Sequence, residues 1–258
     1  MSGTVQNDWN PETYARFRGL RLRPALDLLM QVGAVPRGMV VDLGCGDGAA
    51  AGALQQRYPK HDLIGLDASP AMLAKAKGYS RLIEADAATW TPDGAPALIF
   101  SNAALHWLDG HAALMPRLAG FLAPGGALAV QMPRQYQAPS HRFLRDIAAA
   151  LFPDRFDIAQ FDPPVQPATV YWEMLSPLGQ VQAWETDYIQ HLEPAHDMHP
   201  VRAFTQSTAM RPFVDKMTVD EQEAFTSAYD KALASAYPVL ADGSALMPFR
   251  RVFFVLKV

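Results

Sequence analysis

A regular alternation of short apolar runs with helical segments, between residues 39 and 133, constrains the fold of this chain more than any other feature. The runs MVVDLG, DLIGLD, RLIEAD, PALIFSN and GALAVQM are typical of buried strands. AAAGALQQRY and AALMPRLAGFL indicate helices, and Ser69 with Pro70 predicts the start of another through AMLAKAKGY. Apolar strands belong to parallel sheets covered on both faces, with right-handed crossovers. The sequence therefore predicts an α/β domain.

The pattern changes after residue 133. SHRFLRDIAAALF, TVYWEMLSPL and TVDEQEAFTSAYDKALASAY indicate helices, whereas VQAWETDYIQHL and the closing RRVFFVLKV indicate strands. We expect the late strands to complete a Rossmann-like, seven-stranded and mostly parallel sheet with helices on both faces and a helical cap. The expected domains are an α/β core at 34–133, a cap formed by 1–33 and 134–240 with a sheet strand at about 180–192, and a final strand at 249–258.

The stretch VVDLGCGDG, at residues 40–48, places three glycines directly after the first strand. Such a loop lies where ligands of α/β sheets bind, and glycine allows both a sharp turn and close approach of a ligand to the backbone. Read as G-x-G-x-x-A through Gly44, Gly46 and Ala49, the loop would suit NAD. Read as D-x-G-x-G-x-G from Asp42 to Gly48, it would suit S-adenosylmethionine. The loop alone leaves both cofactors open.

Aspartates at the ends of three successive strands, Asp42, Asp67 and Asp86, favour S-adenosylmethionine. The Asp42 carboxylate would repel a pyrophosphate, whereas it suits the ammonium and sulfonium groups of S-adenosylmethionine. Asp67 can accept the ribose hydroxyls of either cofactor. Asp86 can accept the adenine amino group, with apolar neighbours flanking the ring. The spacing of these carboxylates therefore predicts a S-adenosylmethionine site.

Composition restricts the partners. The net charge of −4 provides no basic field, so we expect neither nucleic acid nor a membrane surface as a partner. The apolar stretch LAGFLAPGGALAVQMP is interrupted by proline and glycine and is not typical of a membrane span. The first residues lack an apolar signal region, and the single cysteine, Cys45, excludes an internal disulfide. Both features predict a cytoplasmic protein.

No metal site is predicted. The residues His191, Glu193, His196, Asp197 and His199 include metal-ligand types but lack a rigid helical spacing, and we interpret them as a solvated loop. Neither a nucleophile elbow nor a phosphate-binding lysine loop occurs, so hydrolase and NTPase activities have no support.

Several fragments resemble a known family. VVDLGCGDG, GLDASPAMLAKA, IEADAATW and SNAALHWL together resemble the class I S-adenosylmethionine-dependent methyltransferases. More narrowly, DWNPETYARF, GALAVQMP, MRPF and FRRVFFV resemble the trans-aconitate 2-methyltransferase family, from about residue 8 to the C-terminus. The resemblance implies methyl transfer to one carboxylate of a small polycarboxylic acid, trans-aconitate, giving a methyl ester. His106 departs from the pattern, because glutamine is expected there in enterobacterial members.

The implied acceptor needs no general base, because a carboxylate is already ionised at neutral pH. The enzyme must instead align the reacting atoms and exclude water. As the candidate catalytic residue, His106 is therefore expected to position the acceptor rather than to remove a proton. Two alternatives stay open: transfer to another small metabolite, with His106 as base, and a cofactor-binding protein without catalysis. A monomer or weak dimer is expected.

The predicted site residues fall into two sets. The cofactor set lies mainly in the loops after the strands and comprises Trp9, Asp42, Gly44, Cys45, Gly46, Gly48, Asp67, Ala68, Met72, Asp86, Ala87 and Asn102. The substrate set contains aromatic residues and arginines, because the planar guanidinium can bind a carboxylate through two hydrogen bonds. It comprises Tyr14, His106, Trp107, Arg134, Arg211 and Arg251. Arg211 and Arg134 are preferred over the further candidates Arg21 and Arg23.

Overall fold

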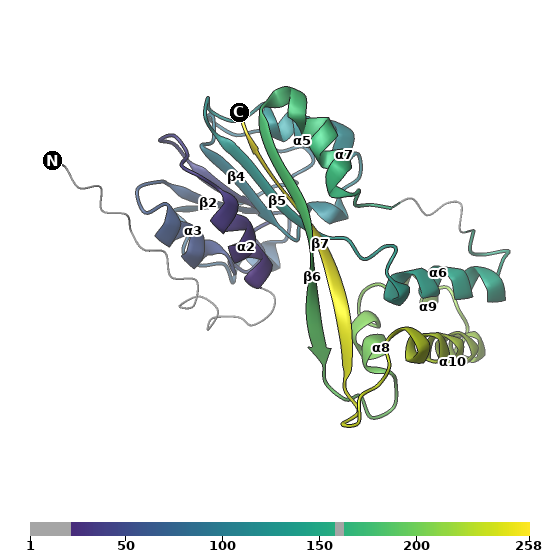
Figure 1. Ribbon diagram of the computed structural model, residues 1–258. Coiled ribbons are helices and arrows are strands. Elements are labelled where there is room, and N and C mark those ends of the chain that lie inside the picture. Colours follow the sequence, from purple (N-terminus) through teal and green to yellow (C-terminus); the bar gives the residue numbers. More distant parts are fainter. Residues whose placement is uncertain (1–21, 158–162) are drawn as a thin grey trace. The chain divides into compact units, whose positions relative to one another are not determined.

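The computed structural model describes residues 22–157 and 163–258, and the strands of these residues form one seven-stranded sheet (Figure 1). The strands lie in the order β3-β2-β1-β4-β5-β7-β6. Their bounds are β1 Val40–Leu43, β2 Leu63–Asp67, β3 Arg81–Glu84, β4 Leu98–Asn102, β5 Ala127–Pro133, β6 Gln180–Leu192 and β7 Ala245–Lys257. The predicted α/β fold with seven strands is confirmed.

The first five strands are parallel. β1 pairs with β2 on one side and with β4 on the other, and these strands pair outward with β3 and β5. The chain thus moves in one direction from β1 to β3 and in the opposite direction from β4 to β5, so the strand order reverses between β1 and β4. A ligand of such a sheet binds beyond the carboxyl ends of the strands at this reversal.

The late strands complete the sheet. The Val258 amide donates to the Gly126 carbonyl at 3.1 Å, and the Arg134 amide donates to the Arg250 carbonyl at 2.9 Å. Residue numbers along β7 therefore fall as those along β5 rise, which makes β7 antiparallel to β5. β6 occupies the sheet edge beside β7, and most of its side chains are exposed or half-buried. The expectation of a mostly parallel sheet is confirmed.

Helices connect and cover these strands. Their bounds are α2 Arg23–Gln31, α3 Ala51–Arg57, α4 Pro70–Leu73, α5 His111–Ala119, α6 Pro139–Leu151, α7 Ala168–Leu175, α8 Pro200–Thr205, α9 Arg211–Val214 and α10 Val219–Ala236, with 3-10 turns η2 Leu105–Trp107 and η4 Ser176–Leu178. The chain leaves β1 through α3 toward β2 and leaves β4 through α5 in the opposite direction. Right-handed crossovers place these two helices on opposite faces of the sheet.

The helix predicted through AMLAKAKGY is much shorter than expected. Ser69 caps it as predicted, accepting the Met72 amide at 3.3 Å, but the helix ends at Leu73. The chain then turns through Gly78, whose φ is 88°, and the Lys77 backbone passes so close to the loop after β1 that a Cβ on Gly48 would lie 3.1 Å from it. A longer helix would not permit this approach, so the helical prediction beyond Leu73 is wrong.

The chain forms two compact units. The first contains the described residues up to Met132, together with Pro167–Glu185 and Val252–Val258, and the second contains Pro133–Gln166 and Thr186–Arg251. The units divide the chain differently from the expected domains, because α2 and α7, expected in the cap, belong to the first unit. Within α2, Leu28 and Leu29 are completely or nearly completely buried.

The second unit has its own apolar core. α6 and α10 pack together, and the buried residues include Leu144, Phe225, Tyr229 and Leu233. The Tyr229 hydroxyl donates to the Ser140 carbonyl at 2.6 Å, so this buried polar group is satisfied. This core includes Phe213 of α9, the short helix that begins with the candidate Arg211.

Candidate cofactor and substrate sites

The glycine-rich loop after β1 adopts backbone conformations that require glycine. Gly44, Gly46 and Gly48 have φ values of 76°, 56° and 86°, which other residues rarely adopt. A Cβ on Gly44 would overlap the Cβ of Ala104, whereas a Cβ on Gly46 would meet nothing within 4 Å. Gly46 therefore presents its backbone to open space, as close approach of a cofactor requires.

Asp67, at the end of β2, fixes this loop. Its Oδ2 accepts the Gly46 amide at 2.8 Å, and its Oδ1 accepts the Ser69 amide at 2.8 Å. An ionised carboxylate offers about four acceptor positions, so these bonds leave room for two more. Asp67 can therefore both hold the loop and accept the ribose hydroxyls of a cofactor.

Asp42, at β1, is buried, with 2% of its surface exposed. Its Oδ2 accepts the Tyr79 hydroxyl at 2.6 Å. The pKa of Asp42 is raised to about 7, mainly by burial. The hydrogen bond from Tyr79 opposes this shift, and the nearby charge of Asp67 adds to it. The sequence predicts a carboxylate here without indicating its exposure, and the structure shows that it is buried. The charge of Asp42 would therefore act on a bound ammonium without broad exposure to solvent.

Side-chain hydrogen bonds of Asp86 and of Arg117, which lies on α5, fix the backbone of the turn after β3. The Asp86 Oδ1 accepts the Ala88 amide at 2.8 Å. Arg117 of α5 donates to the carbonyls of Ala87 and Ala88 at 2.8 Å each and to that of Trp90 at 2.7 Å. Asp86 stays exposed beside Ala87, as expected for groups that contact an adenine. Sequence reasoning missed Arg117, because nothing in its helical context indicates this contact.

The end of β4 lies beside the glycine loop. The Ser101 hydroxyl donates to the Leu43 carbonyl at 2.8 Å and ties β4 to β1. The next residue, Asn102, has a buried side-chain oxygen for which no donor is found among the residues that the structure describes. Ala103 follows with a φ of 53°, a strained conformation for alanine. A buried amide oxygen without a donor fits a ligand that supplies N–H groups, such as the ammonium of S-adenosylmethionine.

The predicted aromatic pair follows in η2. The rings of His106 and Trp107 are 4.6 Å apart, and Trp107 is 76% exposed. Buried His111, at the start of α5, holds this turn: its Nε2 is 2.9 Å from the Leu105 carbonyl and its Nδ1 is 2.7 Å from the Tyr171 hydroxyl. His111 was not predicted, and it is a positioning residue for the turn that carries His106.

The second unit contains the best-buried of the predicted arginines. Arg251, in β7, is 8% exposed, and its guanidinium carbon lies 4.9 Å from the centre of the Phe249 ring. Burial lowers the pKa of Arg251 to about 10, and the Tyr188 phenol opposes this shift. A buried guanidinium is electrostatically suited to a carboxylate ligand, since little water competes for it.

The other predicted arginines are more open to solvent. Arg211 begins α9 with 66% of its side chain exposed, 3.9 Å from Asp215. Arg23 begins α2, also exposed, 3.8 Å from Asp27. Arg134 is half-buried directly after β5. The structure therefore favours Arg251 and Arg134 over Arg211 as ligands of a carboxylate, contrary to the order that the sequence suggests.

The remaining predicted residues are distributed as follows. Ala68 and Met72 follow β2 and are exposed, and Cys45 is buried in the glycine loop, where burial raises the pKa of its thiol to about 12. Trp9, Tyr14 and Arg21 lie outside the described residues. The structure therefore brings the loops after β1, β2, β3 and β4 to one edge of the sheet, as the sequence predicts.

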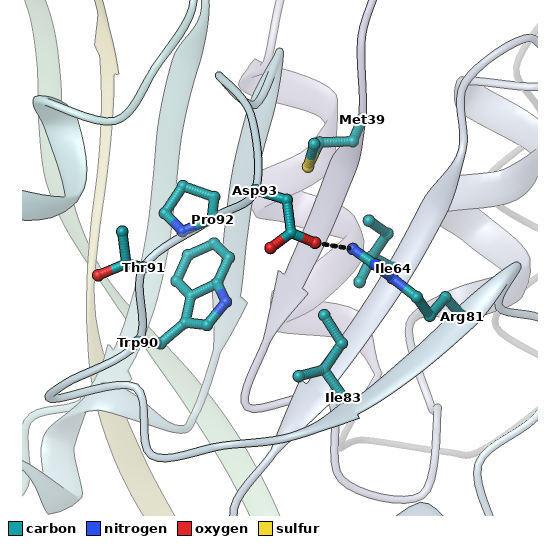
Figure 2. Close-up of a pocket in the computed structure, with 8 residues that line it drawn as sticks. All are labelled: Met39, Ile64, Arg81, Ile83, Trp90, Thr91, Pro92 and Asp93. Carbon is teal, nitrogen blue, oxygen red and sulfur yellow. Dashed lines mark hydrogen bonds and ion pairs between the residues drawn. The ribbon is translucent and has the colours of Figure 1, made fainter.

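Figure 2 shows a pocket of about 250 Å³ that is distinct from this edge. Ile64 and Arg81 lie near the amino ends of their strands, away from the glycine loop. The Arg81 guanidinium is 3.0 Å from the Asp93 carboxylate, and both side chains are largely exposed. The pocket is lined by Met39, Ile64, Arg81, Ile83, Trp90, Thr91, Pro92 and Asp93. It contains none of the predicted site residues.

Of the histidines at the end of β6 and after it, His199 has a structural role. His199 is the N-cap of α8: its Nδ1 accepts the Val201 amide at 3.2 Å, and its Nε2 is 2.9 Å from the Tyr237 carbonyl. His191 lies 3.6 Å from Glu193. Within residues 22–157 and 163–258, no group of three or more metal-ligand side chains is arranged to hold an ion. No helix of these residues is long and apolar enough to span a membrane.

Comparison with known proteins identifies the family. A family model described as a methyltransferase domain matches residues 40–126, which contain the glycine loop and the three strand-end aspartates. A solved structure, the YcgJ protein of Bacillus subtilis, shares the fold with a TM-score of 0.55 at 15% identity, over 90% of this chain and 96% of that chain.

Relatives of similar length are more informative. The trans-aconitate 2-methyltransferase of Methylobacterium radiotolerans is 40% identical over 97% of this chain and 98% of its own length. The enzyme of the same name from Escherichia coli is 37% identical over the same shares of both chains. The likeness therefore includes the second unit as well as the matched methyltransferase domain. This chain belongs to the trans-aconitate 2-methyltransferase family.

Proposed function

We propose that this protein transfers a methyl group from S-adenosylmethionine to one carboxylate of trans-aconitate and forms a methyl ester. The observation that carries the proposal is the full-length similarity, at about 40% identity, to relatives named for this activity. The glycine loop and the strand-end aspartates support the choice of cofactor.

The residues at the sheet edge fit this cofactor. S-adenosylmethionine supplies an electrophilic methyl group on a sulfonium. Asp67 would accept the ribose hydroxyls, and Asp86 with Ala87 would contact the adenine. The Asn102 side-chain oxygen is buried and has no donor among the described residues, so it would accept a hydrogen bond from the ammonium group of S-adenosylmethionine. Asp42 would add a negative charge close to the same ammonium.

The acceptor side requires alignment rather than proton removal. A carboxylate is already ionised at neutral pH, so it attacks without a base. His106 and the exposed Trp107 would position it. The carboxylates that do not react need cationic partners, and we propose buried Arg251 and half-buried Arg134 for this role, with exposed Arg211 contributing less.

The test is a screen of di- and tricarboxylic acids with isotope-labelled S-adenosylmethionine, in which methyl esters are detected by mass spectrometry. We expect labelled ester from trans-aconitate. Transfer to a different metabolite would retain the methyltransferase assignment and replace the substrate. Cofactor binding without transfer to any acid would support the non-catalytic alternative.

The proposed function also has consequences for the partners, the cellular location and the oligomeric state of the protein. We propose a small-molecule substrate without nucleic acid or membrane partners, a cytoplasmic location, and a monomer or weak dimer. The net charge of −4 and the single cysteine support the first two points. Gel filtration coupled to light scattering would test the oligomeric state.

A further inference from the structure

Tyr79 lies in the turn between α4 and β3, and its side chain reaches β1. Its hydroxyl donates to the Asp42 Oδ2 at 2.6 Å, and both residues belong to the first unit. A distance this short is typical of a hydroxyl that donates to an ionised carboxylate. Tyr79 therefore joins the turn before β3 to the strand from which the glycine loop departs.

The Tyr79 ring occupies space beside two glycines. A Cβ on Gly65, in β2, would lie 2.8 Å from a Leu82 methyl and 3.0 Å from the Tyr79 ring, and a Cβ on Gly48 would lie 3.2 Å from the ring. These separations are shorter than the ordinary contact between carbon atoms. Packing against β2 and the glycine loop therefore fixes the ring, and with it the position of the hydroxyl.

The groups that face the Asp42 carboxylate supply no positive charge. They are Tyr79 from the turn before β3, Asp67 from β2 and Cys45 from the glycine loop. Burial and the Asp42 charge raise the pKa values of Tyr79 and of Cys45, so the phenol and the thiol keep their protons at neutral pH. Burial and the charge of Asp67 raise the pKa of Asp42, whereas the hydrogen bond from Tyr79 lowers it. Of these contacts, the hydrogen bond is therefore the one that favours the ionised carboxylate.

We propose that Tyr79 is a positioning residue for the cofactor, which keeps the Asp42 carboxylate ionised and oriented for the ammonium of S-adenosylmethionine. The inference rests on the proposed placement of that ammonium beside Asp42. A hydrogen bond and a nearby cation both favour the charged form of a buried carboxyl group. Tyr79 thus supplies, before the cofactor arrives, part of the stabilisation that the ammonium completes.

The test is calorimetric titration of S-adenosylhomocysteine into wild type and Tyr79→Phe at several pH values from about 6 to 8.5. The variant keeps the ring and loses the donor. Loss of a hydrogen bond to a charged group should raise the midpoint of the increase in affinity with pH by about one unit. Because the pKa of Asp42 is about 7 in wild type, binding at pH 7 should weaken about fivefold. The amino group of the ligand titrates alike in both experiments, so the difference between the midpoints reports the protein.

A second ligand separates the charge of Asp42 from the packing of the loop. Methylthioadenosine has the adenine, the ribose and a neutral thioether, but lacks the ammonium. Its affinity should be nearly independent of pH and should differ less than about twofold between wild type and Tyr79→Phe. Equal weakening of both ligands would assign Tyr79 to packing of the loop alone. That result, or an unchanged midpoint for S-adenosylhomocysteine, would overturn the proposal.

The matched control is Tyr58→Phe. Tyr58 is another buried tyrosine of the first unit, 5% exposed, and its hydroxyl donates to the Gly33 carbonyl at 3.5 Å. Removing this hydroxyl should leave both affinities and the midpoint unchanged, because it does not contact Asp42.

Folding of Tyr79→Phe is checked by thermal unfolding at about pH 6 and pH 8. Without the donor, the buried Asp42 carboxylate is more costly when charged, so the variant should be destabilised more at the higher pH. Folding at the lower pH alone would support the proposal. Failure to fold at both would overturn it in favour of a structural role for the hydroxyl.

The double variant Asp42→Asn/Tyr79→Phe completes the test. Once the Asp42 charge is absent, loss of the Tyr79 hydroxyl should not weaken S-adenosylhomocysteine binding further, and an additional loss would contradict the proposal. If Asp42→Asn alone changes neither the affinity nor its pH dependence, Asp42 does not meet the ammonium and the inference fails. Methyl transfer to trans-aconitate, measured separately, shows whether the proposed function survives that failure.

Discussion

The two compact units offer different kinds of binding group. In the first unit, the candidate cofactor site is built from backbone: three glycines with positive φ, and amides held by Asp67. In the second, the candidate substrate groups are long cationic side chains, of which Arg251 is buried. A backbone site depends on local conformation that few residue types allow, whereas a side-chain site depends on what surrounds each residue in the fold. The first kind is therefore more visible in a sequence.

The largest effect that tests this comparison is expected at Gly44. Gly44→Ala would place a Cβ against that of Ala104 in a strained conformation, and should lower the free energy of unfolding by about 2–4 kcal/mol. Gly46→Ala is the matched control, because its Cβ would meet open space, and should cost about 1 kcal/mol. Denaturant unfolding measures both. Equal losses would show that the packing of Gly44 against Ala104 is not what requires glycine there.

A smaller, pH-dependent effect is expected at Asp42. Its pKa is about 7 in the folded protein and 3.8 ordinarily, so the folded state holds this proton to higher pH than the unfolded state. The contribution of Asp42 to stability therefore falls as the pH rises through that interval. Asp42→Asn should lessen the fall, as thermal unfolding at several pH values would detect.

Cofactor binding should show the opposite trend. An ammonium favours ionised Asp42, so wild-type affinity for S-adenosylhomocysteine should increase about tenfold from pH 6 to 8. Calorimetry with Asp42→Asn should show little increase. Asp93→Asn, an exposed carboxylate of the same unit, is the control and should behave as wild type. A wild-type affinity independent of pH would remove Asp42 from the site.

The smallest effect is expected at His106. With a carboxylate acceptor, His106→Gln should change the transition-state free energy by less than about 1 kcal/mol, because no proton is removed. The wild-type rate at saturating cofactor should be nearly constant from about pH 6 to 8. A rise with a midpoint near the ordinary histidine value of about 6.5, lost in the variant, would instead identify His106 as a base and a different acceptor.

Much of the first unit could be predicted from the sequence. Apolar runs and the glycine loop indicate the strands and their carboxyl ends, because strand burial and positive φ leave direct marks on residue type. Asp67 lies at the end of its strand, as the sequence predicts. Tyr79 was missed, since its contact with Asp42 depends on a turn near Gly78 where the sequence suggests a helix.

The second unit could be predicted only in part. Its helices and late strands were recognised from periodicity, but the burial of individual arginines was not. Arg211 and Arg145 both lie in helices of this unit, yet one is exposed and the other buried. Neighbouring residues do not determine that difference, which arises from packing of α6 against α10 and the segments around them.

The most direct test of the division of roles between the units compares Asp67→Ala with Arg251→Ala in calorimetric titrations. Asp67→Ala should weaken S-adenosylhomocysteine binding by about 1–3 kcal/mol through loss of hydrogen bonds to its carboxylate. Arg251→Ala should leave that affinity intact and weaken trans-aconitate binding to the cofactor-saturated protein by about 2–4 kcal/mol. If Arg251→Ala instead binds trans-aconitate as wild type does, or loses cofactor affinity as Asp67→Ala does, the proposed separation of cofactor and substrate residues is contradicted.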